Sequence, residues 1–152
     1  MCFLLVAVFA LIGPNKLVQA EETPALSNKE TRVENMKERI KAVYEKVKVR
    51  IQIRIERLNG IILRVENLAD KIAAKGKDVS QAKASLQDAR ASLAKATDFF
   101  KQADAKIQEL SGSDDPQAIL AEIRNLTKSA NTEMKNCRAK IVEAVNSLKA
   151  LK

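Results

Sequence analysis

Residues 79–110 read VSQAKASLQDARASLAKATDFFKQADAKIQEL and repeat with a period of seven. One series of core positions holds bulky residues, and an interleaved series holds mostly alanine. The bulky series is Val79, Leu86, Leu93, Phe100 and Ile107, and the small series is Ala82, Ala89, Ala96, Ala103 and Leu110. An unbroken repeat of this kind predicts a coiled-coil-like helix. Alanine at every seventh position lets a neighbouring backbone approach closely, which is typical of an antiparallel helix pair. The short link 75–78 makes the preceding helix the expected partner.

Residues with strong terminal preferences bound this helix. Asp78 and Gln81 have the spacing of a reciprocal cap, in which each side chain satisfies a backbone amide at the start of a helix. Ser111 and Gly112 end the repeat. We therefore predict a helix over 79–110.

A second apolar stripe precedes it, with a mean step of about 3.5 residues. The spacing of Ser27 and Glu30 suits a capping box, and Gly76 suits the left-handed position after a last turn. We therefore predict a helix over about 28–75, with one stutter between Val47 and Ile55. The stripe is Val33, Met36, Ile40, Val43, Val47, Ile51, Ile55, Leu58, Ile62, Val65, Ala69 and Ile72.

Residues 47–55 within this stripe also alternate apolar and polar side chains, which by itself indicates a strand. We favour the helix because the 3.5-residue step continues on both sides and no turn residues bound the segment. Val49, Ile53 and Leu63 then fall off the main stripe, so this helix is expected to touch two partners.

A third helix is predicted over 116–151, because Asp115 precedes Pro116 and proline is favoured at the first helical position. Its stripe is Ile119, Ile123, Leu126, Ala130, Met134, Cys137, Ile141, Ala144, Leu148 and Leu151. At about 1.5 Å per residue the helices would measure roughly 70, 50 and 55 Å, so the first should overhang the others or bend. The expected fold is all-α: an elongated, antiparallel, up-down-up three-helix bundle in one domain, residues 21–152.

The chain starts with an uncharged apolar run over 1–12, followed by Gly13 and Pro14. Small residues at Val18 and Ala20 match a signal-peptidase site, which predicts a cleaved signal peptide over 1–20 and an exported product. The run is too short to span a bilayer of about 30 Å. No basic residue precedes it, and an uncleaved short anchor is the alternative.

Cleavage there would leave Cys137 as the single cysteine, so no internal disulfide could form. Two interpretations remain open. Cys137 is either a small buried core residue or, if exposed, the site of an intermolecular disulfide.

The composition disfavours catalysis. The chain has no His and no Trp, and its carboxylates lie between Lys and Arg at helix-surface positions. Neither a phosphate-binding loop nor a Cys/His cluster with metal spacing occurs. We predict a protein that is not an enzyme and that uses no metal and no cofactor.

Positive charge is concentrated in the first helix. Residues 29–77 contain 14 Lys and Arg against 7 Asp and Glu, whereas the whole chain has a net charge of +8. Such a face can attract nucleic-acid phosphate, anionic lipid head groups or acidic wall polymers, or it can simply be a solvated surface. Sequence-specific nucleic-acid binding is disfavoured, since few aromatic residues could stack on bases. The candidate contacts are Lys46, Lys48, Arg50, Arg54, Arg57 and Arg64.

The segment 57–68, RLNGIILRVENL, resembles exported helical-hairpin proteins of candidate-phyla bacteria, as do Lys71-Ile72, Gly76-Lys-Asp-Val-Ser80 and the alanine-rich helix that follows. The resemblance covers roughly residues 45–107. It implies an envelope or secreted location and a helical hairpin, and it transfers no activity or functional residue.

Three functions are consistent with this sequence. The leading hypothesis is an exported, non-catalytic envelope protein that contacts anionic components through its basic first helix. A periplasmic-type holdase chaperone would instead present the doubly apolar segment 47–63 to unfolded clients. A self-assembling coiled-coil stalk would use the overhang of the first helix to form a homo-oligomer.

Overall fold

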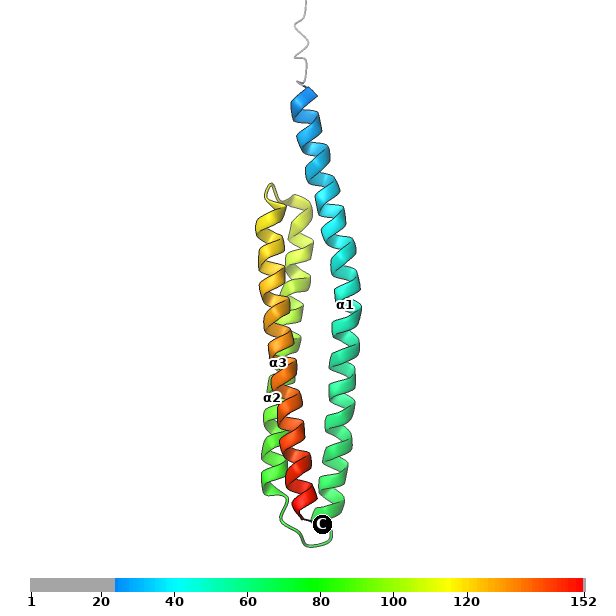
Figure 1. Ribbon diagram of the computed structural model, residues 1–152, viewed down its shortest axis with the longest axis vertical. Coiled ribbons are helices and arrows are strands. Elements are labelled where there is room, and N and C mark those ends of the chain that lie inside the picture. The colour runs from blue at the N-terminus through cyan, green and yellow to red at the C-terminus, as the bar shows by residue number, and fades with distance from the viewer. Residues whose placement is uncertain (1–23, 152) are drawn as a thin grey trace, which may run out of the picture.

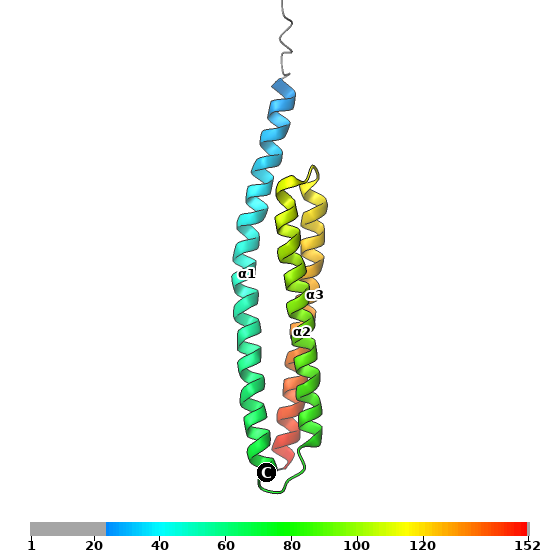
Figure 2. The same ribbon diagram turned by 180° about the vertical axis from the view of Figure 1, so that it is seen from behind.

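The computed structural model describes the backbone of residues 24–151 and the side chains of residues 29–151. These residues form three long helices, α1 (Pro24–Ala73), α2 (Ser80–Glu109) and α3 (Pro116–Ala150), with a short 3-10 helix η1 (Leu110–Gly112) after α2. The helices pack side by side along a common long axis (Figures 1 and 2). An all-α fold with three packed helices is thus confirmed for residues 24–151, and the strand alternative for 47–55 is excluded. The expected signal peptide, 1–20, lies outside the described residues.

The start of α1 differs from the prediction. The helix begins at Pro24, so Ser27 already has helical backbone and the predicted start at 28 is wrong. Proline is well suited to the first helical position, because it has no N–H to leave unpaired there and its φ is already helical. At the other end α1 stops at Ala73, two residues before the predicted end. Gly76 follows with a φ of 77° and donates its N–H to the Ala73 carbonyl at 2.8 Å, as the left-handed position requires.

The other helix ends follow the predicted residues closely. Helix α2 starts at Ser80, one residue late, because the Asp78 carboxylate accepts the Ser80 N–H (2.9 Å) and leaves Val79 as the N-cap. This hydrogen bond lowers the pKa of Asp78. Regular α-helix gives way to η1 at Leu110. Helix α3 starts at Pro116 as predicted and ends at Ala150, one residue early; its N-cap Asp115 accepts from two backbone amides, at 3.0 and 3.1 Å.

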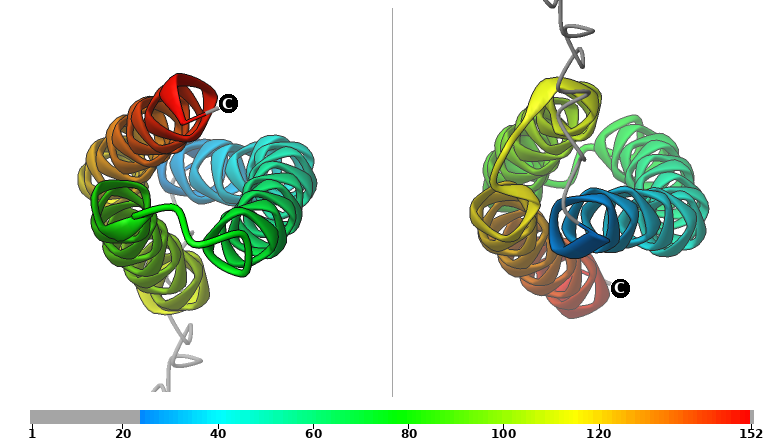
Figure 3. Two further views of the ribbon diagram at one scale, coloured as in Figure 1. Left: turned by 90° about the horizontal axis from the view of Figure 1, so that it is seen from below. Right: turned by 90° about the horizontal axis from the view of Figure 1, so that it is seen from above.

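All ten heptad positions of 79–110 are buried, but the partner of the alanine series is not the one predicted. The backbones of α2 and α3 approach each other most closely, and α1 lies further from both (Figure 3). On α3 the facing small residues are fully buried, namely Ala130, Cys137 and Ala144. The connection from α2 to α3 is as short as the one from α1, so link length could not decide between the two neighbours.

One position of the α1 stripe was also assigned wrongly. Val43 is 62% exposed, and Tyr44 is buried in its place. The Tyr44 ring stacks on Phe100 with centroids 6.5 Å apart, and its hydroxyl donates to Asp104 at 3.1 Å. Burial and the nearby Asp104 carboxylate raise the pKa of Tyr44 well above its usual value. The contact with Phe100, which is distant in sequence, therefore makes Tyr44 and not Val43 the inward-facing residue of this turn.

Helix α1 extends beyond the α2–α3 connection, as its predicted length required (Figure 1). Its 50 residues span about 75 Å, against about 45 Å for the 30 residues of α2. Near the connection, Lys37 donates to the Ser111 carbonyl at 3.3 Å and Lys41 donates to the Ser111 hydroxyl at 2.9 Å. The start of α1 extends past these contacts and forms the overhang (Figure 1).

The close α2–α3 approach leads to a stability prediction. Replacing fully buried Ala89 by Leu forces extra volume into the tightest contact of the bundle. We expect Ala89→Leu to lower the free energy of unfolding by about 1–3 kcal/mol, measured by urea denaturation followed by circular dichroism. Ala91→Leu, on the exposed side of the same helix, is the matched control and should change it by less than about 0.5 kcal/mol. Equal effects of the two substitutions would contradict the packing described.

Candidate anion-binding flank of α1

Helix α1 has one inward-facing stripe and two flanks. Because successive helical residues lie 100° apart, the residue before each inward position lies on one flank and the residue after it lies on the other. The inward positions are all buried or half-buried: Val33, Met36, Ile40, Tyr44, Val47, Ile51, Ile55, Leu58, Ile62, Val65, Ala69 and Ile72. The residues that follow them form the α2-side flank, and the residues that precede them form the α3-side flank.

The α2-side flank is tied to α2 by ion pairs. Lys48 contacts Asp104 at 2.9 Å, Asp70 contacts Lys83 at 2.9 Å, and Glu66 accepts two hydrogen bonds from Arg90, at 2.7 and 2.6 Å. Five residues of this flank are acidic and three are Lys. Its members are Glu34, Lys37, Lys41, Glu45, Lys48, Gln52, Glu56, Asn59, Leu63, Glu66, Asp70 and Ala73.

The α3-side flank has eight basic residues and no acidic one. Its members are Arg32, Asn35, Arg39, Val43, Lys46, Arg50, Arg54, Arg57, Ile61, Arg64, Leu68 and Lys71. Arg54 donates to the Asn131 side chain of α3 at 3.2 Å, which fixes the direction of this flank. Within residues 29–151, none of the eight basic side chains forms an ion pair. Positive charge is therefore segregated to one side of the helix.

The structure brings together five of the six candidate contacts predicted from the sequence. Lys46, Arg50, Arg54, Arg57 and Arg64 all lie on the α3-side flank. Lys48 does not, because it follows an inward position and faces α2. Its hydrogen bond to the Asp104 carboxylate raises the pKa of Lys48 and occupies its ammonium group.

Three basic residues of the same flank were missed by counting charge density along the chain. They are Arg32, Arg39 and Lys71, each of which directly precedes a position of the apolar stripe. That relation to the stripe was readable from the sequence. Density alone could not separate the two flanks, because helical neighbours three or four residues apart share a face and sequence neighbours do not.

Helix α2 supplies the ion-pair partners on both of its sides. Towards α3, Lys106 contacts Glu122 at 3.1 Å, and Asp88 contacts Lys140 at 3.8 Å. Between α1 and α3, by contrast, the polar contact in the described chain is the Arg54–Asn131 hydrogen bond. The α1–α3 side of the bundle thus carries positive charge that is not neutralised by carboxylates of the described chain.

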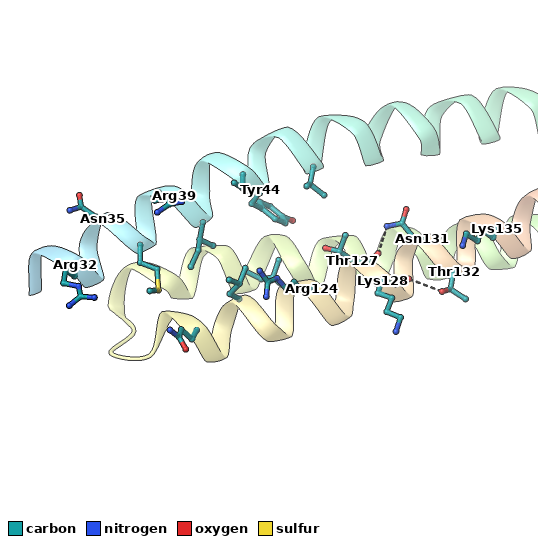
Figure 4. A pocket seen from close by; sticks show the side chains of 17 residues that line it. Arg32, Asn35, Arg39, Tyr44, Arg124, Thr127, Lys128, Asn131, Thr132 and Lys135 are labelled. Atoms are coloured by element: carbon teal, nitrogen blue, oxygen red, sulfur yellow. Dashed lines mark hydrogen bonds between the residues drawn. The ribbon is translucent and has the colours of Figure 1, made fainter. Parts of the chain in front are cut away.

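A groove of about 1200 Å³ lies on this side, between the first half of α1 and the first half of α3. We call it the α1–α3 groove; side chains from both helices face each other across it (Figure 4). Its apolar residues are Met36, Ile40, Val43, Tyr44, Val47, Leu120 and Ile123, and its basic residues are Arg32, Arg39, Arg124, Lys128 and Lys135. Asn35, Gln117, Thr127, Asn131 and Thr132 complete the lining, and no acidic residue of the described chain contributes to it.

The Cys137 thiol and the potential metal ligands of the described chain do not form a second site. Cys137 is 0% exposed, and burial raises the pKa of its thiol. The interpretation of Cys137 as an intermolecular disulfide site is therefore wrong, since that bond needs an accessible thiol. Within residues 24–151 no group of three or more His, Cys, Asp or Glu could hold a metal ion, and no helix has an apolar stretch long enough to cross a bilayer.

Comparisons with known protein families, with characterised proteins and with solved structures find no match for this chain. The expected resemblance to exported helical-hairpin proteins is therefore untested.

The buried thiol gives a direct test of the α3 packing. In a Cys2→Ser variant, where Cys137 is the single cysteine, we expect native Cys137 to react with a thiol reagent such as Ellman's reagent at least 100-fold more slowly than in 8 M urea, since reaction requires the helix to open. No disulfide-linked dimer should form under mild oxidation. Native labelling as fast as in urea would contradict the burial.

The Glu66–Arg90 pair gives a pH prediction. The hydrogen bond from Arg90 lowers the folded-state pKa of Glu66, so the pair stabilises the fold above the unfolded pKa of about 4.3 and loses that effect as pH falls further. Because both side chains are partly exposed, the contribution is below about 1 kcal/mol.

We therefore expect Glu66→Gln to lower the free energy of unfolding at pH 7 and to leave it nearly unchanged at pH 3, measured by urea denaturation at both values. Glu56→Gln, on the same flank but without an ion pair, should have little effect at either pH. A deficit of Glu66→Gln that persists at pH 3 would contradict the assigned pair.

Proposed function

We propose that this protein is an exported, non-catalytic binding module that attaches to anionic surfaces of the cell envelope through the α3-side flank of α1. The observation that supports it best is the segregation of eight basic residues, with no acidic residue and no ion pair, on one side of a single long helix. A cationic surface that is only a solubility feature has no need to exclude acidic residues from one flank while placing five on the other.

The spacing of these charges suits an extended anionic partner. From Arg32 to Lys71 the flank runs about 58 Å, so its eight cations lie on average about 8 Å apart along the axis. That spacing is close to the Debye length at physiological ionic strength, so the fields of neighbouring cations still overlap. An extended polyanion or a lipid surface would meet a continuous positive potential.

Exposed aliphatic side chains favour lipid head groups over nucleic acid. Among the described side chains, residues 29–151, six of the seven large exposed hydrophobic residues belong to α1, and three of them, Val43, Ile61 and Leu68, lie on the α3-side flank itself. Helices that lie in a membrane interface combine such side chains with Lys and Arg. Stacking on bases would need accessible aromatic rings, yet Tyr44 and Phe100 are buried and Phe99 is half-buried.

The same proposal includes three further features: export through a signal peptide over 1–20, an up-down-up coiled-coil-like arrangement, and the absence of catalytic activity. The small-residue site ending at Ala20 supports export, and the heptad pattern of 79–110 supports the coiled-coil-like arrangement. The lack of His and the position of the carboxylates between Lys and Arg support the absence of catalytic activity. A bundle of this length would act as a rigid spacer whose basic side faces the envelope.

The proposal predicts salt-sensitive binding to anionic vesicles. We expect the protein to co-sediment with phosphatidylglycerol vesicles at 50 mM NaCl and to be released at 500 mM. At about 1 kcal/mol per basic residue near an anionic membrane, the triple variant Arg50→Gln, Arg57→Gln, Arg64→Gln should bind about 100-fold more weakly.

The matched control removes the same charge elsewhere. Lys77, Lys95 and Lys101 are exposed and lie off α1, so replacing all three by Gln should weaken vesicle binding less than fivefold. Equal losses in the two triple variants would reduce the effect to net charge, and absence of binding at 50 mM NaCl would refute the proposal.

A second candidate function, a holdase chaperone, is favoured by exposed aliphatic residues of α1 that do not belong to the α3-side flank, namely Val49, Ile53 and Leu63. It predicts that the protein suppresses aggregation of reduced insulin at 500 mM NaCl, where anion binding is screened. A self-assembling stalk predicts an oligomer in light scattering at micromolar concentration. Vesicle binding by a monomer that does not protect insulin would exclude both.

A further inference from the structure

The α1–α3 groove differs from the rest of the basic side in having an apolar floor. Ile40, Tyr44 and Ile123, which line it, belong to the hydrophobic core, and Met36, Val47 and Leu120 pack against that core. The groove is thus an unfilled continuation of the core and not only a charged surface. Its occupant has to bury apolar side chains there.

The dimensions of the groove match a helix. Its α1 wall runs from Arg32 to Val47, about 22 Å, and its α3 wall runs from Gln117 to Lys135, about 27 Å. Four turns of α-helix measure about 22 Å. A volume of about 1200 Å³ exceeds what most small-molecule pockets offer.

The distribution of charge selects an acidic helix. Basic residues lie on both walls, with Arg32 and Arg39 in the first half of the α1 wall and Arg124, Lys128 and Lys135 in the middle and at the end of the α3 wall (Figure 4). A lipid with one anionic head group would need its cations gathered at one end. An amphipathic helix with carboxylates on both sides of an apolar stripe would meet cations along its whole length, as flanking charges do in coiled coils.

We propose that the α1–α3 groove binds an acidic amphipathic helix of a partner protein, which completes a four-helix arrangement at this end of the bundle. A second copy of this chain is a poor occupant because its net charge is also strongly positive. The membrane contact uses the whole α3-side flank and shares Arg32, Arg39 and Val43 with the groove. The inference does not rest on that contact, because the α3 wall and the apolar floor of the groove are not part of the flank.

The probe is a synthetic 18-residue peptide with Leu at the two core positions of each heptad and Glu at the flanking positions. A scrambled peptide of equal composition has the same charge without an apolar stripe. We expect the amphipathic peptide to bind the full chain with a micromolar Kd by fluorescence anisotropy, and the scrambled one to bind at least tenfold more weakly.

Charge-reversal variants locate the site. Arg39→Glu with Arg124→Glu should weaken binding of the amphipathic peptide at least tenfold, and the matched pair Arg57→Glu with Arg64→Glu, exposed on the same flank but outside the groove, less than threefold. Vesicle binding should show the opposite pattern, weakened more by the second pair. Circular dichroism checks that both variants stay helical, and Val43→Asp at an exposed groove position serves as a second probe that should also weaken peptide binding.

Three results would overturn the inference. They are no peptide binding at 100 μM, equal binding of the amphipathic and scrambled peptides, and equal losses in the two charge-reversal pairs. Binding of oleate or anionic vesicles that is abolished by Arg39→Glu with Arg124→Glu, while peptide binding is unaffected, would assign the groove to a lipid instead. Because vesicle and peptide binding are measured separately, failure of this inference and failure of the proposed function are distinguishable.

Discussion

The close approach of α2 and α3 along their buried small residues is the constraint on which the rest of the molecule depends. Alanine at Ala89 and Ala96 leaves no room for another side chain between these two backbones, so α1 packs against the pair from outside. Its single inward stripe then meets both neighbours, and its two flanks face different helices. Carboxylates on α2 and on the α2-side flank pair with Lys and Arg across that interface, while the charged residues of the α3-side flank are all basic.

Much of this fold could be predicted from local patterns. The heptads of 79–110, the Asp115–Pro116 start and the left-handed Gly76 are each set by nearby residues, and the structure agrees with them. The errors fell where distant residues decide. Tyr44 and not Val43 lies in the core, because its ring stacks on Phe100 and its hydroxyl donates to Asp104. The alanine series of α2 predicted a close helix contact but did not show that the neighbouring helix is α3. One error was local: α1 begins at Pro24, which suits the first helical position, and not after the predicted cap at Ser27.

The sequence predicted a basic surface on the first helix, but it identified only part of the residues that form the candidate site. Counting basic residues along the chain found the right helix and five residues of the right flank. It included Lys48, which pairs with Asp104, and it missed the α3 wall of the groove altogether. Which cations remain without a carboxylate depends on which helix lies beside them, and local sequence patterns do not identify that helix. The groove, with its apolar floor and cationic walls, appears only when α1 and α3 are placed together.

The most direct test of the charge segregation is an NMR titration of the labelled protein with sodium polyphosphate at low salt. The account predicts that side-chain signals of the α3-side flank, such as Arg50 and Arg57, shift progressively and return to their starting positions when salt is added. Signals of the α2-side flank, such as Lys48, should stay in place, because Asp104 already occupies its ammonium group. Shifts spread evenly over both flanks, or centred on α2, would contradict the account.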